Sequence, residues 1–79
     1  MKVRVKLIAN YRAALPPNHK QGVVELDVPR GATVYDVISR FDIPLNDESV
    51  IVLNGLTVDM STPLQEDDMV TAFSAIAGG

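Results

Sequence analysis

The chain has 79 residues, with seven Lys and Arg against ten Asp and Glu, and it contains no cysteine. This length allows one small domain, and the lack of cysteine excludes disulfides, thiolate metal sites and side-chain thiol chemistry. The net charge of −3 and the absence of tryptophan argue against a nucleic-acid-binding surface. No apolar run approaches the roughly 20 residues of a membrane-spanning helix, and the charged start is unlike a signal peptide. We therefore expect a soluble, cytoplasmic domain.

Residues 2–8 alternate basic and apolar side chains, which predicts a strand with one buried face. Residues 23–28 alternate in the same way, but their outward positions are acidic. If these two strands are neighbours, cross-strand ion pairs help to fix their register, each worth a fraction of a kcal/mol. Between them, residues 10–22 include Pro16-Pro17 and are expected to form an irregular polar loop.

A helix is predicted to begin after Thr33, which suits an N-cap because Asp36 follows at the capping-box position. Its apolar residues recur three and four positions apart and are expected to face a sheet: Val34, Val37, Ile38 and Phe41. Pro44 prevents the helix from continuing further.

The second half of the chain predicts three more strands. Residues 50–53 are a continuous apolar run, which is typical of a buried central strand. Asn54-Gly55 favours a tight turn into a short return strand at 56–58. Residues 61–68 are expected to form a loop or a single 3₁₀ turn, and residues 69–75 the last strand.

This order of elements predicts the α+β arrangement of the β-grasp, or ubiquitin-like, fold. It has a mixed sheet of four to five strands, one main helix packed on one face, and the first and last strands parallel at the centre. We expect a single domain over residues 1–75 and a flexible Gly-Gly tail over residues 76–79.

The chain ends in Gly78-Gly79, which follow the last predicted strand after two intervening residues. Glycine has no Cβ, so a glycine tail can enter a slot that is too narrow for other residues. The terminal carboxylate is a poor electrophile, but after activation it becomes an acyl donor. We therefore predict that Gly79 is the reactive end of the molecule.

Several segments resemble the small subunit of molybdopterin synthase and its relatives, the ubiquitin-like sulfur carriers. The resemblance covers essentially the whole chain and is strongest in the last thirty residues. It is carried by these motifs: Val50-Ile51-Val52-Leu53-Asn54-Gly55, Pro63-Leu64, Asp68-x-Val70 and Phe73-x-x-Ile76-Ala77-Gly78-Gly79. The chain departs from the family at Ser74-Ala75, where a Pro-Pro pair is common, and at Asp67-Asp68, where Gly-Asp is common.

The resemblance implies a cycle in which a ubiquitin-activating-type enzyme uses ATP to adenylate Gly79. A sulfur donor protein then converts Gly79 to a thiocarboxylate. The tail enters the large subunit of molybdopterin synthase and delivers sulfur to a pterin precursor for molybdenum or tungsten cofactor formation. The chain itself is expected to be a non-catalytic carrier that binds no cofactor and no metal.

The resemblance also assigns roles around the tail. Ile76, Ala77 and Gly78 are expected to thread into the partner, and Phe73 to pack on the partner's surface. Ile8 is a second candidate for partner binding. An ordinary core position remains the alternative for Phe73, and a position without a binding role remains the alternative for Ile8.

Three other functions stay open. The chain can be a ubiquitin-like modifier conjugated to lysines, a sulfur carrier for the thiazole of thiamine, or a β-grasp interaction module without tail chemistry. All seven basic residues lie at or before Arg40, so the acidic second half either docks on a basic partner or is simply a solvated surface. His19, the single histidine, is expected to be a solvated loop residue.

Overall fold

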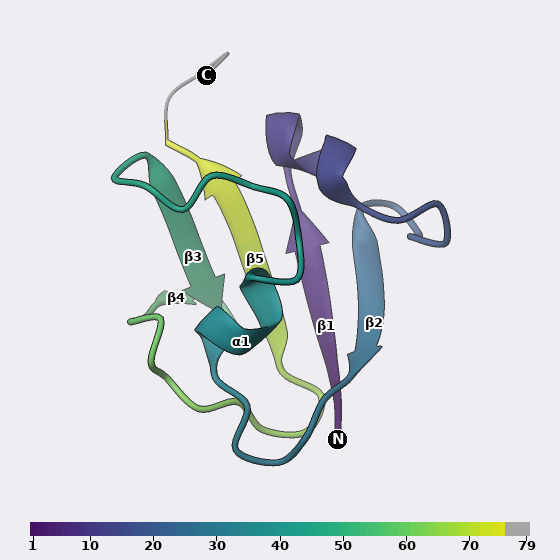
Figure 1. Cartoon of the computed structure of the whole chain (residues 1–79), viewed down its shortest axis with the longest axis vertical. Coiled ribbons are helices and arrows are strands. Elements are labelled where there is room, and N and C mark those ends of the chain that lie inside the picture. The colour runs from purple at the N-terminus through teal and green to yellow at the C-terminus, as the bar shows by residue number, and fades with distance from the viewer. Residues whose placement is uncertain (76–79) are drawn as a thin grey trace.

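The computed structural model describes residues 1–75 (Figure 1). Within them, five strands form one mixed sheet in the order β2-β1-β5-β3-β4. The helix α1 lies across one face of this sheet (Figure 1). The elements are β1 (Lys2–Leu7), the 3₁₀ helix η1 (Ala9–Ala14), β2 (Val23–Asp27), α1 (Val34–Ile38), β3 (Ser49–Leu53), β4 (Leu56–Thr57) and β5 (Met69–Ser74). The architecture is the predicted α+β, β-grasp arrangement.

The central pair of strands, β1 and β5, runs parallel. The inward residues of both strands are fully buried, and they lie on the face that α1 covers: Val3, Val5, Leu7, Val70 and Ala72. The outward residues of β1 are exposed, as the alternation of basic and apolar residues predicts. The expected neighbours β1 and β5 are therefore confirmed, and they form the middle of the core.

Cross-strand ion pairs link β1 to β2, which runs antiparallel to it. The Lys2 ammonium lies 3.3 Å from Asp27 and 3.5 Å from Glu25. A hydrogen bond and Coulomb attraction from Asp27, together with attraction from Glu25, raise the pKa of Lys2 above its usual value. Solvent screens these exposed charges, so the pairs help to specify register more than they stabilise the fold.

The expectation of an irregular loop over residues 10–22 was wrong at its start, where η1 forms. Tyr11 of η1 is only 3% exposed, and its hydroxyl lies 2.7 Å from Ser49 Oγ and 3.4 Å from the carbonyl oxygen of Pro44. Ala14 and Leu15 also pack against the core. The apolar spacing of residues 11, 14 and 15 is helical, and this signal was hidden by the polar residues around it.

The helix α1 begins as predicted, but it is shorter than the apolar stripe. The Thr33 backbone N–H donates to Asp36 Oδ2 at 2.9 Å, and the Asp36 N–H donates to Thr33 Oγ1 at 3.2 Å. These two bonds form the capping box. Backbone bonds from Arg40 to Val37 and from Phe41 to Ile38 tighten the end of the helix into a 3₁₀-type turn. Phe41 therefore packs on the core from beyond the helix.

The strand β3 is not the buried central strand that its continuous apolar run suggests. It lies between β5 and the short edge strand β4. Only Ile51 of β3 is buried, and its other residues are half-buried. The reason is that, within residues 1–75, α1 covers one face of the sheet and no layer covers the other face, called here the open face (Figure 1). Alternate residues of β3 lie on this open face.

We predict that Thr33→Ala lowers the free energy of unfolding by about 1 kcal/mol, because the N3 backbone N–H loses its acceptor. The exposed Ser61, in a loop, provides a matched control, since Ser61→Ala removes a hydroxyl that has no role in capping. Urea denaturation of both variants measures the difference. Equal stabilities for the two variants would show that the capping box contributes nothing.

We also predict that Tyr11→Phe lowers the free energy of unfolding by about 1 kcal/mol, because the partly buried hydrogen bond between the Tyr11 hydroxyl and Ser49 Oγ is lost. Tyr35→Phe is the control, since Tyr35 is 53% exposed on α1. Thermal denaturation followed by circular dichroism compares them. A Tyr35→Phe effect as large as that of Tyr11→Phe contradicts the proposed link.

Candidate functional site

The candidate site lies where β5 ends, because the sequence continues from there into Gly78-Gly79. Val70 and Ala72 of β5 are buried in the core. Thr71 and Phe73 alternate with them and so lie on the open face. Phe73 is half-buried and lies outside the group of buried core residues.

An apolar row crosses the open face at this end of the sheet. Phe73 is directly opposite Val50 of the antiparallel strand β3. On the other side, the extended residue Ile8 follows β1, and its N–H donates to the Ala72 carbonyl at 3.1 Å. Since Leu7 is paired with Ala72, the next position, Ile8, comes beside Phe73. We call Ile8, Phe73 and Val50 the apolar row.

The apolar row is partly accessible. Ile8 is 39% exposed, while Phe73 and Val50 are half-buried. Lys6, Thr71 and Val52 form the next row along the same face, so the border of the apolar row is polar beside β1 and β5 and apolar beside β3. Val50 was missed as a candidate because the continuous apolar run of its strand hid the period of two. The sheet register brings it beside Phe73.

The root of the tail is fixed by a hydrogen bond from the Ala75 N–H to the Glu48 carbonyl, at 2.7 Å. The loop that carries Glu48 is itself folded, because the Glu48 N–H donates to Asn46 Oδ1 at 2.9 Å. Asp47 and Glu48 are both exposed in this loop. The chain therefore leaves the domain beside acidic side chains.

Four of the predicted site residues, Ile76, Ala77, Gly78 and Gly79, lie outside the described residues, so their roles stay predictions. Phe73 and Ile8 come together in the apolar row, and their binding to a partner also stays a prediction. His19 differs from the expected solvated residue. It is half-buried, and its Nδ1 accepts a hydrogen bond from the Gly22 N–H at 3.2 Å, so it supports the loop before β2.

Residues 1–75 hold no group of three or more His, Asp or Glu side chains arranged to bind a metal ion. In the same residues, no helix has both the length and the apolar character needed to cross a membrane.

Solved structures similar to this one are small proteins of the same fold. SAMP1 from Haloferax volcanii superposes with a TM-score of 0.77 and 22% identity, over 100% of both chains. A putative molybdopterin converting factor, subunit 1, from Pyrococcus furiosus has a TM-score of 0.76 and 23% identity, over 95% of this chain and 98% of the other. The HVO 2177 protein of Haloferax volcanii has a TM-score of 0.77 and 25% identity, over 100% of this chain and 87% of the other.

No curated protein matches the sequence. The model of one family, Mut7-C ubiquitin, matches residues 1–77, nearly the whole chain. The chain therefore belongs to the Mut7-C ubiquitin family, and its β-grasp fold and structural neighbours confirm the ubiquitin-like resemblance drawn from its sequence.

Proposed function

We propose that this protein is a sulfur carrier whose terminal residue, Gly79, is adenylated and then converted to a thiocarboxylate for molybdopterin biosynthesis. The observation that carries the proposal is the combination of a ubiquitin-like domain with Gly78-Gly79 a few residues beyond its central strand β5. A solved neighbour described as a putative molybdopterin converting factor subunit supports the choice of pathway.

The proposed chemistry begins with activation, because an ionised α-carboxylate resists nucleophilic attack. A carboxylate oxygen of Gly79 attacks the α-phosphorus of ATP on a ubiquitin-activating-type enzyme, and pyrophosphate leaves. A sulfide-level sulfur from a donor protein then attacks the acyl carbon, a C–S bond forms, and AMP leaves with the shared oxygen. In the large subunit of molybdopterin synthase, the thiocarboxylate sulfur attacks a carbon of a pterin precursor and displaces an oxygen leaving group. Water then hydrolyses the resulting thioester, which leaves the sulfur on the precursor and restores the carboxylate.

The length of the tail limits how the partners bind. Beyond Ala75, a segment of four residues reaches at most about 13–14 Å when fully extended. The acyl carbon of Gly79 therefore reaches a partner's active site only if the folded domain docks close to the entrance. Because glycine lacks a side chain, the last two residues fit a narrow channel.

The apolar row is the docking surface that this geometry favours. Ordering four free residues costs about 1–2 kcal/mol each. Burying about 200–300 Å² of apolar surface returns a similar amount, at roughly 25 cal/mol per Å². Phe73, Ile8 and Val50 lie at the root of the tail, so a partner that accepts the tail meets this row at the same time.

Conjugation to lysines is the second candidate function, because one solved neighbour is described as a small archaeal modifier protein. Both candidates need an adenylated Gly79, and they differ in the nucleophile that follows. Sulfur transfer to a thiazole in thiamine synthesis would need the same thiocarboxylate at Gly79. An interaction module without tail chemistry is the remaining outcome of the tests below.

Intact-mass spectrometry of the protein isolated from its own cells tests the chemistry. We expect a fraction of the chains to show exchange of one oxygen for sulfur at Gly79, and deletion of Gly79 to abolish it. Leu56→Ala is the control, because Leu56 is 71% exposed on β4. Gly-Gly remnants on lysines of other proteins would favour the modifier. If Gly79 is unmodified and the variant that lacks Gly79 still functions in cells, both the sulfur carrier and the modifier are contradicted.

Calorimetric binding to the adenylating enzyme tests the docking surface. We expect Phe73→Ala to weaken binding by at least about tenfold, as loss of a buried aromatic anchor does. Tyr35→Ala removes an exposed aromatic from α1, on the opposite face, and should leave the affinity unchanged. If Tyr35→Ala weakens binding and Phe73→Ala does not, the partner docks on the helix face instead.

A further inference from the structure

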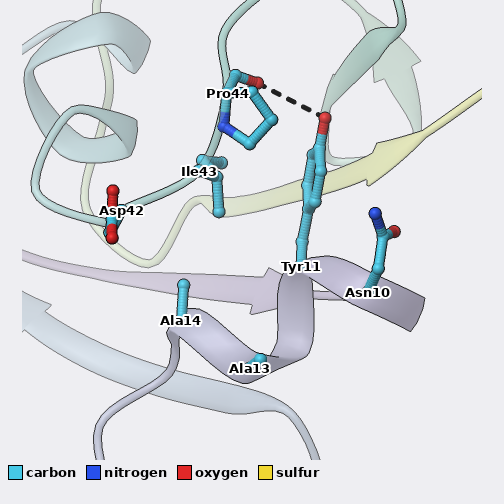
Figure 2. Close-up of a pocket in the computed structure, with 7 residues that line it drawn as sticks. All are labelled: Asn10, Tyr11, Ala13, Ala14, Asp42, Ile43 and Pro44. Atoms are coloured by element: carbon cyan, nitrogen blue, oxygen red, sulfur yellow. Dashed lines mark hydrogen bonds between the residues drawn. The ribbon is translucent and has the colours of Figure 1, made fainter. Parts of the chain in front are cut away.

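A pocket of about 470 Å³ separates η1 from the loop that follows α1. Ala13 and Ala14 line it from η1, and Ile43 and Pro44 line it from the loop (Figure 2). These two walls come from segments about thirty residues apart in sequence. None of the proposed tail chemistry uses this pocket.

Hydrogen bonds fix the two walls relative to each other. Tyr11 stands between them, and its hydroxyl reaches the Pro44 carbonyl, as the dashed line in Figure 2 marks. Ser49 Oγ lies 2.7 Å from the same hydroxyl and also donates to the Pro44 carbonyl, at 2.5 Å. The pocket is therefore formed before any ligand binds, which lowers the ordering cost of binding.

The pocket has an apolar middle and polar ends. The Asp42 carboxylate lies at one end and the Asn10 amide at the other (Figure 2). Asp42 is exposed, and none of the ion pairs between the described residues involves it. The guanidinium of Arg12, on η1, lies beside Gly22. A Cβ built on Gly22 would be 3.7 Å from the guanidinium carbon. The carboxylate is thus available to a ligand from outside.

The pocket lies at the end of the molecule from which the tail leaves. The end of β5, η1 and the loop between α1 and β3 gather there (Figure 1). The Ala75 N–H bonds to Glu48 of the same loop. A protein that holds the tail therefore approaches the end of the molecule on which this pocket lies.

We propose that the pocket receives an arginine side chain from the adenylating enzyme that activates the tail, an inference that rests on the proposed function. The alkyl stem of an arginine packs along Ala13, Ala14 and Ile43, as long charged side chains do on apolar surface. Its guanidinium forms a bidentate pair with Asp42. Asp42, Asp47 and Glu48 are exposed on the loop between α1 and β3, so this loop attracts a basic partner surface.

Arginine suits the site better than lysine for two reasons. The planar guanidinium matches a carboxylate with two parallel hydrogen bonds, whereas an ammonium is a compact and strongly hydrated point charge. Arginine also stays protonated at all physiological pH values. It therefore does not attack an activated acyl group at the end of the tail, whereas a lysine amine is a nucleophile.

Nuclear magnetic resonance titration with short capped peptides tests the pocket directly. The probes are acetyl-Gly-Arg-Gly-amide, its lysine analogue and its citrulline analogue, which keeps the shape of arginine without the charge. We expect the arginine peptide to shift the amide signals of residues 10–14 and 42–44, and to bind about threefold more tightly than the citrulline peptide, as an ion pair to an exposed carboxylate allows. The lysine peptide should bind with intermediate affinity, and salt should weaken both charged peptides.

Asp42→Asn should abolish the preference for the arginine peptide over the citrulline peptide. The control is Asp59→Asn, which removes an exposed acid that does not line the pocket and should leave this preference unchanged. Ala13→Leu, which fills the pocket without changing charge, should weaken the arginine peptide. Signals shifted around Asp59 or Glu66 instead, or an unchanged preference in Asp42→Asn, would overturn the proposal.

The proposed function can fail independently of this pocket. If wild-type protein never acquires sulfur at Gly79 but the arginine peptide still binds at Asp42, the sulfur chemistry is wrong and the pocket stands. If Gly79 is converted to a thiocarboxylate but the peptide does not bind, only the pocket is wrong.

Discussion

The parallel pairing of β1 with β5 is the constraint on which the rest of the molecule depends. It buries Val3, Val5 and Leu7 beside Val70 and Ala72, which are all close to fully inaccessible. Parallel strands need a long crossover, and the intervening chain places α1 over this central pair, with β2 on one side of it in the sheet and β3 and β4 on the other. The same pairing brings the ends of β1 and β5 to one end of the sheet, and Ile8 comes to lie beside Phe73. A buried central strand thus becomes a rigid base for the tail.

The small size of α1 has a second consequence. Because α1 covers one face, the open face carries the partly exposed apolar row, and the space beside α1 is closed by η1 and the loop after the helix. The hydroxyl of Tyr11 joins these two segments through Ser49 and Pro44. The domain therefore offers two different surfaces at the end of the molecule where β5 ends: the apolar row and the pocket beside Asp42. A partner that contacts both surfaces can bind the domain in only one orientation.

Much of this fold could be predicted because its strongest local signals agree with the tertiary structure. The alternation along β1 and β2, the capping box of Thr33 and Asp36, and the Asn54-Gly55 turn all lie where the sequence predicts them.

The predictions that failed did so for physical reasons. The helical spacing of residues 11, 14 and 15 is a weak local signal, and the hydrogen bond between the Tyr11 hydroxyl and Ser49, 38 residues away, has no local signal at all. The continuous apolar run of β3 suggested burial on both faces, but no second layer covers the open face. The pocket beside Asp42 depends on the meeting of two segments and has no sequence motif. The roles of residues 76–79 depend on a partner and stay predictions.

The central claim is that the carboxyl carbon of Gly79 is the reactive atom and that the domain presents it. Exchange of radiolabelled pyrophosphate into ATP by the cognate adenylating enzyme tests this claim most directly, because that exchange requires reversible formation of the acyl-adenylate. The claim predicts rapid exchange when the enzyme is given the protein with its free C-terminal carboxylate, and none when it is given the same protein as a C-terminal amide. Equal exchange with the two forms would contradict it.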